Sequence, residues 1–246
     1  MTLTAMKTGG RPPHSTEAFP PSPRVFRDRR DAGRRLGEAL ADQYRGRSDV
    51  LVLALPRGGV PIGVEVADTL EAEFDLMLVR KLGVPGQREL AMGAVATGGV
   101  SVLNDDVIRR LGIEYDIIDA VAGHERAELK RRERVYRGDR PPVKLEGRSV
   151  LLVDDGLATG ATMRAAVEAA RLTRPAEVVV AVPVGAVDTC RELAEVADKV
   201  ICLVSPEPFL AIGDCYRSFP QVRDFEVRRL LDSRRSSANP STRASI

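Results

Sequence analysis

The sequence has few of the residues from which disulfide frameworks and metal centres are built. Its 246 residues include three cysteines, two histidines and no tryptophan. Cys190, Cys202 and Cys215 are odd in number and lack the C-x-x-C spacing of common metal sites, and two distant histidines cannot complete a zinc site with them. We therefore expect a protein of a reducing compartment, the cytoplasm.

Long apolar runs are also missing. A membrane-spanning helix needs about 18 or more consecutive apolar residues, whereas the longest candidate, residues 178–187, is interrupted by Pro183 and Gly185. Residues 1–24 contain five prolines and no apolar run of the length found in secretory signals. We expect no membrane partner and a disordered leader over residues 1–24.

Neither sign of charge dominates the chain, because 37 basic residues face 35 acidic residues and leave a formal charge of +2. Arginines cluster between Arg24 and Arg35, but Asp28 and Asp31 interrupt them. The cluster therefore favours the solvated face of an amphipathic helix over residues 25–44 rather than a nucleic-acid contact. No nucleic-acid partner is expected.

Short apolar runs alternate with helical patterns, which predicts one α/β domain over residues 25–234. The expected strands are residues 50–55, 76–79, 150–153, 178–182 and 200–204, and the expected helices are residues 60–70, 162–172 and 187–197. This alternation is typical of βαβ units, so the central sheet should be mostly parallel and flanked by helices.

Two stretches depart from this alternation. Residues 82–103 predict a loop and a hairpin of residues 92–96 and 100–103, and a long helix follows over residues 115–138. Residues 235–246 predict a disordered tail.

One segment carries most of the chemical information. The apolar run 150–153 is followed by Asp154-Asp155-Gly156-Leu157-Ala158-Thr159-Gly160-Ala161-Thr162. A small-residue loop that opens a helix presents unpaired backbone N–H groups, which can bind a phosphate together with the threonine hydroxyls. Adjacent carboxylates only accept hydrogen bonds, so a vicinal diol is a suitable partner for them. The pattern indicates a site for ribose 5-phosphate.

The alternative for Asp154 and Asp155 is a pair that only caps a turn. Acidic side chains turned inward over an occluded loop would favour that alternative. An open loop that admits an anion would favour the sugar phosphate site.

These nine residues resemble the signature of the type I phosphoribosyltransferases for 5-phosphoribosyl-1-diphosphate (PRPP), which is an apolar strand, two acids and a Thr-Gly-x-Thr loop. The resemblance covers about residues 25–232. It implies a Rossmann-like fold with a flexible loop and a small hood, formed by the first residues and about residues 205–222. The residues that it implies for PRPP binding here are Asp154, Asp155, Gly156, Leu157, Ala158, Thr159, Gly160, Ala161 and Thr162.

Two other stretches place cations after predicted strands. Arg57-Gly58-Gly59 precedes a helix, where backbone amides and the helix dipole can hold an anion; by itself it is equally an ordinary turn between strand and helix. The resemblance implies that Arg57, Gly58 and Gly59 form the diphosphate loop of the PRPP site. It also implies that Arg80 and Lys81 contact the diphosphate, and that the segment after them closes over the site.

The resemblance implies a Mg²⁺-dependent pentosyltransferase. A nitrogen nucleophile displaces diphosphate from the anomeric carbon of PRPP, while Arg57, Arg80 and Lys81 neutralise the leaving group together with Mg²⁺. Asp154 and Asp155 hold the ribose. No side chain is expected as a firm direct metal ligand, because Mg²⁺ binds through PRPP, with Asp154 or Asp155 reached through water. Losing one such group typically lowers a rate ~10²–10³-fold.

The acceptor is not identified by the sequence, although a nucleobase-like molecule is implied. Hypoxanthine-type relatives carry an Asp general base where this chain has Ala158, and a Lys after the next strand, where residues 181–185 have none. The loop is more similar to the adenine and orotate types, which leaves Glu89 as the candidate general base. In the hood, Phe209 and Tyr216 are candidates for stacking on the acceptor.

Two other function classes stay open. A non-catalytic sensor would bind PRPP and regulate a partner; it needs the phosphate loop but not the cations over the leaving group. A nucleotidase or kinase is disfavoured because the loop lacks the Walker A lysine. The resemblance implies a homodimer, with PRPP and a small-molecule acceptor as ligands.

Overall fold

The structure, a computed structural model, describes residues 24–238, without the side chains of residues 88, 89 and 235–238. The expected leader therefore lies outside the described residues, apart from Arg24. The central sheet has five parallel strands in the order β2-β1-β6-β7-β8. They are β1 (Val50–Ala54), β2 (Glu73–Leu76), β6 (Ser149–Val153), β7 (Glu177–Val184) and β8 (Lys199–Val204).

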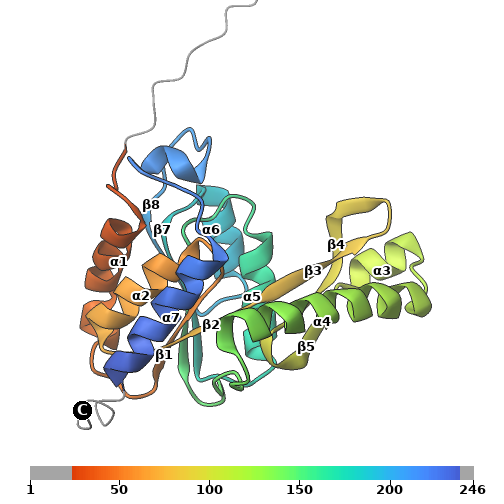
Figure 1. Cartoon of the computed structure of the whole chain (residues 1–246). Helices are drawn as coiled ribbons and strands as arrows, with labels where there is room; N and C mark the ends of the chain where they lie inside the picture. The colour runs from red at the N-terminus through yellow and green to blue at the C-terminus, as the bar shows by residue number, and fades with distance from the viewer. Residues whose placement is uncertain (1–23, 239–246) are drawn as a thin grey trace, which may run out of the picture.

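Helices cover both faces of this sheet, which explains the continuous apolar strands (Figure 1). On one face, α1 (Arg29–Tyr44) and α2 (Gly59–Leu70) pack against residues such as Leu151 and Val153 of β6. On the other face, α5 (Ala161–Arg171) and α6 (Val187–Ala194) pack against Val150 and Leu152. Because successive residues of a strand point to opposite faces, a strand that is buried throughout fills both cores. The predicted α/β fold is confirmed.

The start of α1 is fixed by a side chain. Asp28 is the N-cap residue, and its Oδ1 accepts a hydrogen bond from the backbone N–H of Asp31 at 2.9 Å. Such caps satisfy one of the helix's otherwise unpaired N–H groups.

We expect Asp28→Ala to lower the free energy of unfolding by about 1 kcal/mol, the usual value of an N-cap. Urea denaturation followed by circular dichroism measures the change. Asp28→Asn is the matched control, because its side-chain oxygen can still accept the bond. An equal loss in both variants would contradict the capping role.

A second, antiparallel sheet projects from the central one (Figure 1). It contains β3 (Val79–Val84), β4 (Gln87–Ala96) and β5 (Val100–Leu103), with the short 3₁₀ helix Thr97–Gly99 between the last two strands. The predicted hairpin is thus confirmed, but the loop expected before it is wrong, because β3 continues to Val84 and β4 already begins at Gln87. The predicted strand 76–79 is wrong, because Leu76 ends β2 of the central sheet and Val79 begins β3 of the other. An apolar run does not show which of two sheets its residues join.

Three helices complete this side of the molecule. They are α3 (Asp105–Leu111), α4 (Tyr115–Arg137) and α7 (Asp224–Ala238), and α7 packs against both α2 and α4. The sequence predicted only the long α4. Helix α7 continues to Ala238, so the first four residues of the expected tail are helical, and residues 239–246 lie outside the described residues.

The first described residues and the segment after β8 meet in the predicted hood. Phe26 forms a β-bridge with Tyr216, and the Phe26 N–H donates to the carbonyl of Cys215 at 2.9 Å. Cys215 ends the 3₁₀ helix Ile212–Cys215, and the peptide bond between Glu207 and Pro208 is cis. The apolar cluster of the hood therefore combines residues before and in α1 with residues that end β7 and β8 or follow β8.

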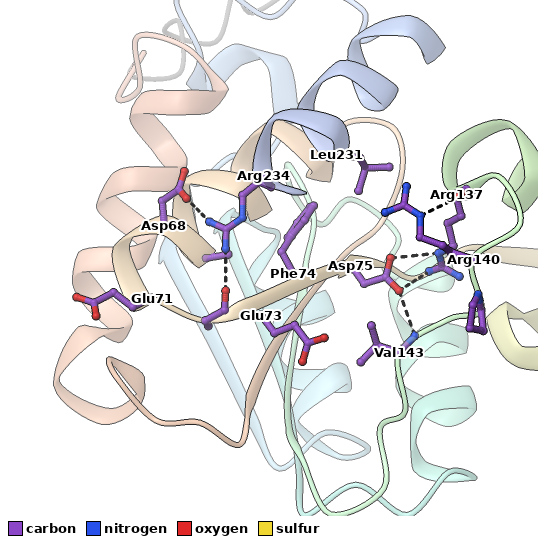
Figure 2. A pocket seen from close by; sticks show the side chains of 13 residues that line it. Asp68, Glu71, Glu73, Phe74, Asp75, Arg137, Arg140, Val143, Leu231 and Arg234 are labelled. Carbon is purple, nitrogen blue, oxygen red and sulfur yellow. Dashed lines mark hydrogen bonds and ion pairs between the residues drawn. The ribbon is translucent and has the colours of Figure 1, made fainter. Parts of the chain in front are cut away.

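A cavity of about 680 Å³ lies beside β2, at the edge of the central sheet (Figure 2). Four of its charged side chains form two ion pairs: Arg137 donates to Asp75 at 3.1 Å, and Arg234 pairs with Asp68. These ion pairs hold the ends of α4 and α7 against β2 and α2. These paired charges in the cavity wall therefore have a structural role.

Candidate functional site

The two predicted loops meet where the strand order of the sheet changes direction. From β1 the chain passes through α2 to β2 on one side, and from β6 it passes through α5 to β7 on the other. The loops after neighbouring strands then diverge and leave a crevice at their carboxyl ends, the usual ligand site of such sheets. Arg57-Gly58-Gly59 follows β1, and Asp154-Asp155 follows β6.

Gly58 and Gly59 lie directly against the two acids. A Cβ on Gly58 would stand 2.0 Å from Asp155 Oδ2, and a Cβ on Gly59 would stand 3.1 Å from Asp154 Oδ1 and 2.6 Å from the Val153 carbonyl oxygen. No side chain fits at either position. The paired glycines thus allow the backbone of the first loop to contact the acid pair of the second.

Asp155 is held by a cation that the sequence analysis did not identify. Arg29, from the first turn of α1, donates from Nε and Nη2 to Asp155 Oδ2 at 2.9 and 2.7 Å. Its guanidinium lies 3.6 Å from the ring centre of Phe219, and its Nη1 donates to the Pro220 carbonyl at 2.6 Å. Burial raises the pKa of Asp155, and Arg29 opposes that rise.

Asp154 accepts the backbone N–H of Asp155 on its Oδ1 at 2.8 Å. Burial, and then the neighbouring charge of Asp155, raise the pKa of Asp154 well above its ordinary value. Both acids are partly exposed, whereas Ala158 and Thr159 are exposed. Asp155 is therefore turned toward Arg29, but the loop beside it is open.

The loop after the acids is fixed by contacts on both sides. The Leu157 N–H donates to the Val184 carbonyl at 2.9 Å, and Thr189 Oγ1 donates to the Ala158 carbonyl at 2.6 Å. Gly160 has φ of 67°, a conformation that favours glycine, and it caps α5. The first backbone hydrogen bond of α5 runs from the Arg164 N–H to the Gly160 carbonyl oxygen at 2.8 Å. The backbone N–H groups of the residues before Arg164 in the first turn are therefore available to an anion.

Two predicted cations share a cleft with this loop. Arg80 and Lys81 of β3 line a cavity of about 810 Å³ together with Thr162, and α4 contributes His124 and Glu125. Arg80 Nε donates to Glu125 Oε2 at 2.6 Å. The structure thus brings Arg80, Lys81 and the phosphate loop together.

Arg57 lies in a different cavity. Its guanidinium is 3.8 Å from Asp224 of α7, and it lines a small polar cavity of about 130 Å³ with residues of α4 that include Arg131, Arg132 and Tyr136. The peptide bond between Pro56 and Arg57 is cis. The structure therefore places the backbone of this predicted loop at the acid pair and its side chain away from the Arg80 cleft.

The remaining predicted residues are placed less directly. Glu89 belongs to β4, but its side chain lies outside the described part of the structure. Phe209 is half-buried in the hood. Tyr216 is buried, with its ring stacked on Phe219 at 4.7 Å, and its hydroxyl donates to the Asp155 carbonyl at 2.7 Å. Stacking of an acceptor on Tyr216 would require Phe219 to move, and that role stays a prediction.

The hydrogen bond of Tyr216 instead connects the hood to the backbone of the acid pair. We expect Tyr216→Phe to lower the free energy of unfolding by about 1 kcal/mol, because the part-buried Asp155 carbonyl loses this hydrogen-bond donor. Urea denaturation provides the measurement, and Tyr115→Phe, at a tyrosine that is 80% exposed, is the control. A Tyr216→Phe variant as stable as the control would contradict a stabilising role for this hydrogen bond.

Sequence reasoning missed Arg29, His124 and Glu125. Each lies on a helix that was interpreted only as a solvated or structural surface. His124 had one available signal, since the chain has only two histidines. Arg29 had none, because it is one of several arginines in a basic run.

Among the described residues, no group of three or more His, Cys, Asp and Glu side chains is arranged to hold a metal ion. None of the described helices is long and apolar enough to cross a bilayer.

Comparisons with known proteins give one consistent result. Residues 86–209, half of the chain, match the family model described as a phosphoribosyl transferase domain. Two Mycobacterium tuberculosis proteins, provisionally named phosphoribosyl transferases, are 48% identical over 209 residues, which are 85% of this chain and 47% of each relative. The chain thus spans about half the length of these curated relatives.

A solved structure is similar over nearly its whole length. The crystal structure of TT1426 from Thermus thermophilus shares 43% identity and superposes with a TM-score of 0.77, covering 84% of this chain and 97% of that one.

Proposed function

This chain belongs to the family of phosphoribosyl transferase domains, and from that premise we propose that it transfers a 5-phosphoribosyl group from PRPP to a nitrogenous, nucleobase-like acceptor. Diphosphate is the second product, and the reaction depends on Mg²⁺. The observation that carries the proposal is the contact of Gly58 and Gly59 with Asp154 and Asp155, in the crevice beside an open phosphate loop.

Each group has a role that follows from its place. The N–H groups of the first turn of α5, with the hydroxyls of Thr159 and Thr162, bind the 5-phosphate. Asp154 accepts hydrogen bonds from the ribose hydroxyls. Arg80 and Lys81, which line the same cavity as Thr162, stabilise the negative charge that develops on the leaving diphosphate.

The residues present fit a Mg²⁺ ion that is bound mainly through substrate. Mg²⁺ typically takes one or two carboxylates together with substrate phosphates and water, and Asp154 offers a carboxylate at the crevice. When bound, the ion supplies positive charge to the diphosphate.

A second candidate function is PRPP binding without transfer. Two observations favour it, since Arg80 is paired with Glu125 and Asp155 with Arg29. Both groups are thus engaged within the protein. A protein that binds PRPP without transferring the group does not need Arg80 or Asp155 to act on the substrate. In such a protein these ion pairs serve the structure alone.

The test is an assay of diphosphate release with PRPP, Mg²⁺ and a panel of nucleobases, with Asp154→Asn as the control variant. The expected result is release with one class of acceptor and almost none in the variant. PRPP binding without release for any acceptor would favour the second candidate. No PRPP binding would overturn both.

A further inference from the structure

Two of the three cysteines lie side by side. Cys190 is in α6 and Cys202 in β8; both are unpaired and partly exposed, whereas Cys215 is buried. A Cβ on Gly185 would stand 2.8 Å from Cys190 Sγ and 3.4 Å from Cys202 Sγ. Both sulfur atoms therefore pack against the same glycine, whose missing side chain leaves room for them.

The two thiols differ in acidity. Their mutual interaction is the largest cause of both shifts: it lowers the pKa of Cys202 to about 7 and raises the pKa of Cys190. Cys202 Sγ also lies 3.3 Å from the Val204 carbonyl and 3.6 Å from Ser205 Oγ. The lowered pKa makes Cys202 the thiol of the pair that ionises first, and the thiolate is the reactive form of cysteine.

This thiol pair is connected to the phosphate loop. Gly185 pairs with Leu157, and the Ala186 N–H donates to the Leu157 carbonyl at 3.0 Å. Thr189, the neighbour of Cys190 in α6, holds the Ala158 carbonyl through its Oγ1 at 2.6 Å. A shift of α6 therefore moves a direct partner of the loop.

We propose that Cys190 and Cys202 are a redox modification site, at which a hydroperoxide forms a reversible disulfide that weakens the binding of a sugar phosphate by the neighbouring loop. The effect on sugar phosphate binding rests on the proposed function, whereas the formation of the disulfide does not. The bond that forms is about 2.05 Å long, so closing it draws Cys190 toward β8 and moves Thr189.

The chemistry balances in two steps. The Cys202 thiolate attacks one oxygen of the hydroperoxide, the O–O bond breaks, and the products are a sulfenic acid and, after protonation, water or an alcohol. The Cys190 sulfur then attacks the sulfenic sulfur, the S–O bond breaks, and the hydroxide leaves as water with the Cys190 proton. The two thiols lose two electrons, which reduce the peroxide. A dithiol reductant then reduces the disulfide by exchange, which restores both thiols and leaves the reductant as a disulfide.

The first test follows the bond itself in the full chain. After reduction and removal of the reductant, stoichiometric hydrogen peroxide should lower the number of free thiols, measured under denaturing conditions, from three to one, and peptide mapping should link Cys190 to Cys202. Cys215→Ser is the matched control and should still form the link, whereas Cys190→Ser should not. A link through Cys215, a link between chains, or overoxidation of Cys202 with Cys190 free would overturn the proposal.

The second test measures PRPP binding in Mg²⁺ by calorimetry. Oxidation should weaken the affinity by about 5–150-fold, the usual range of coupling between two sites, and dithiothreitol should restore it. The affinity of Cys190→Ser should not respond to peroxide. An oxidised protein with unchanged affinity would overturn the coupling. A reduced protein that does not bind PRPP would instead overturn the proposed function and leave the disulfide result standing.

Discussion

Asp154→Asn is expected to lower the rate of diphosphate release by about 10²–10³-fold, the usual effect of removing one well-placed electrostatic group. Asparagine keeps the shape of the side chain and can still accept the Asp155 N–H bond on its oxygen. What it removes is the charge that orients the ribose hydroxyls. Steady-state kinetics with saturating acceptor and varied PRPP measures the loss.

The same variant should be at least as stable as the natural protein. Because burial and the Asp155 charge raise the pKa of Asp154, its ionised form costs stability at neutral pH, and the neutral amide removes that cost. We therefore expect the Tm to stay level or rise while activity falls. Asp106→Asn, at a side chain that is 90% exposed, is the control and should change neither. Activity within tenfold of the natural protein would contradict the role of Asp154.

Arg29→Met should destabilise the protein by about 3–5 kcal/mol, the usual cost of leaving one member of a buried ion pair alone. Arg29 is 8% exposed and supplies two hydrogen bonds to Asp155, so its loss leaves a carboxylate with little access to water. The free energy of unfolding in urea at pH 7 measures the effect. In the double variant Arg29→Met/Asp155→Asn, the neutral amide should recover part of the loss.

The loss in the free energy of unfolding that Arg29→Met causes, here called the deficit, should depend on pH with a definite sign. The folded pKa of Asp155 is raised by burial above the ordinary value of 3.8, and losing Arg29 removes a cause that lowers it. Between the unfolded and folded pKa values the folded state holds a proton that the unfolded state has released, so stability falls as pH rises through that window. The deficit should therefore shrink toward pH 3.8. A deficit that does not change with pH would show that Asp155 is not the group left uncompensated.

Strands β1, β6, β7 and β8 and both site loops could be predicted from the sequence because their signals are local. An apolar run between turn residues indicates a buried strand, and small residues that open a helix indicate an anion site whatever lies around them. The sequence therefore placed Arg57-Gly58-Gly59 and Asp154-Asp155 after strands. That the two loops share one site was implied only by the family resemblance, and the strand order of the structure places them on neighbouring strands.

The partners of these loops could not be predicted in the same way. Arg29 and Asp155 are 126 residues apart, and nothing in either segment specifies the other. The contact of Gly58 with Asp155 is likewise a property of the assembled sheet. Interpreting Asp154-Asp155 as a pair with one shared role overlooked that one acid is already compensated by the protein.

The contacts of Asp155 also constrain when the site can exist during synthesis. They come from separate stretches of the chain: Arg29 precedes the first strand, Gly58 follows it, and Tyr216 lies in the hood. A ribosome must therefore translate beyond residue 216 before the acid pair can acquire its surroundings. A fragment limited to residues 86–209, which the family model matches, would carry the phosphate loop without Arg29 to compensate the charge of Asp155. It would also lack the backbone of Gly58 and Gly59 that contacts the acid pair.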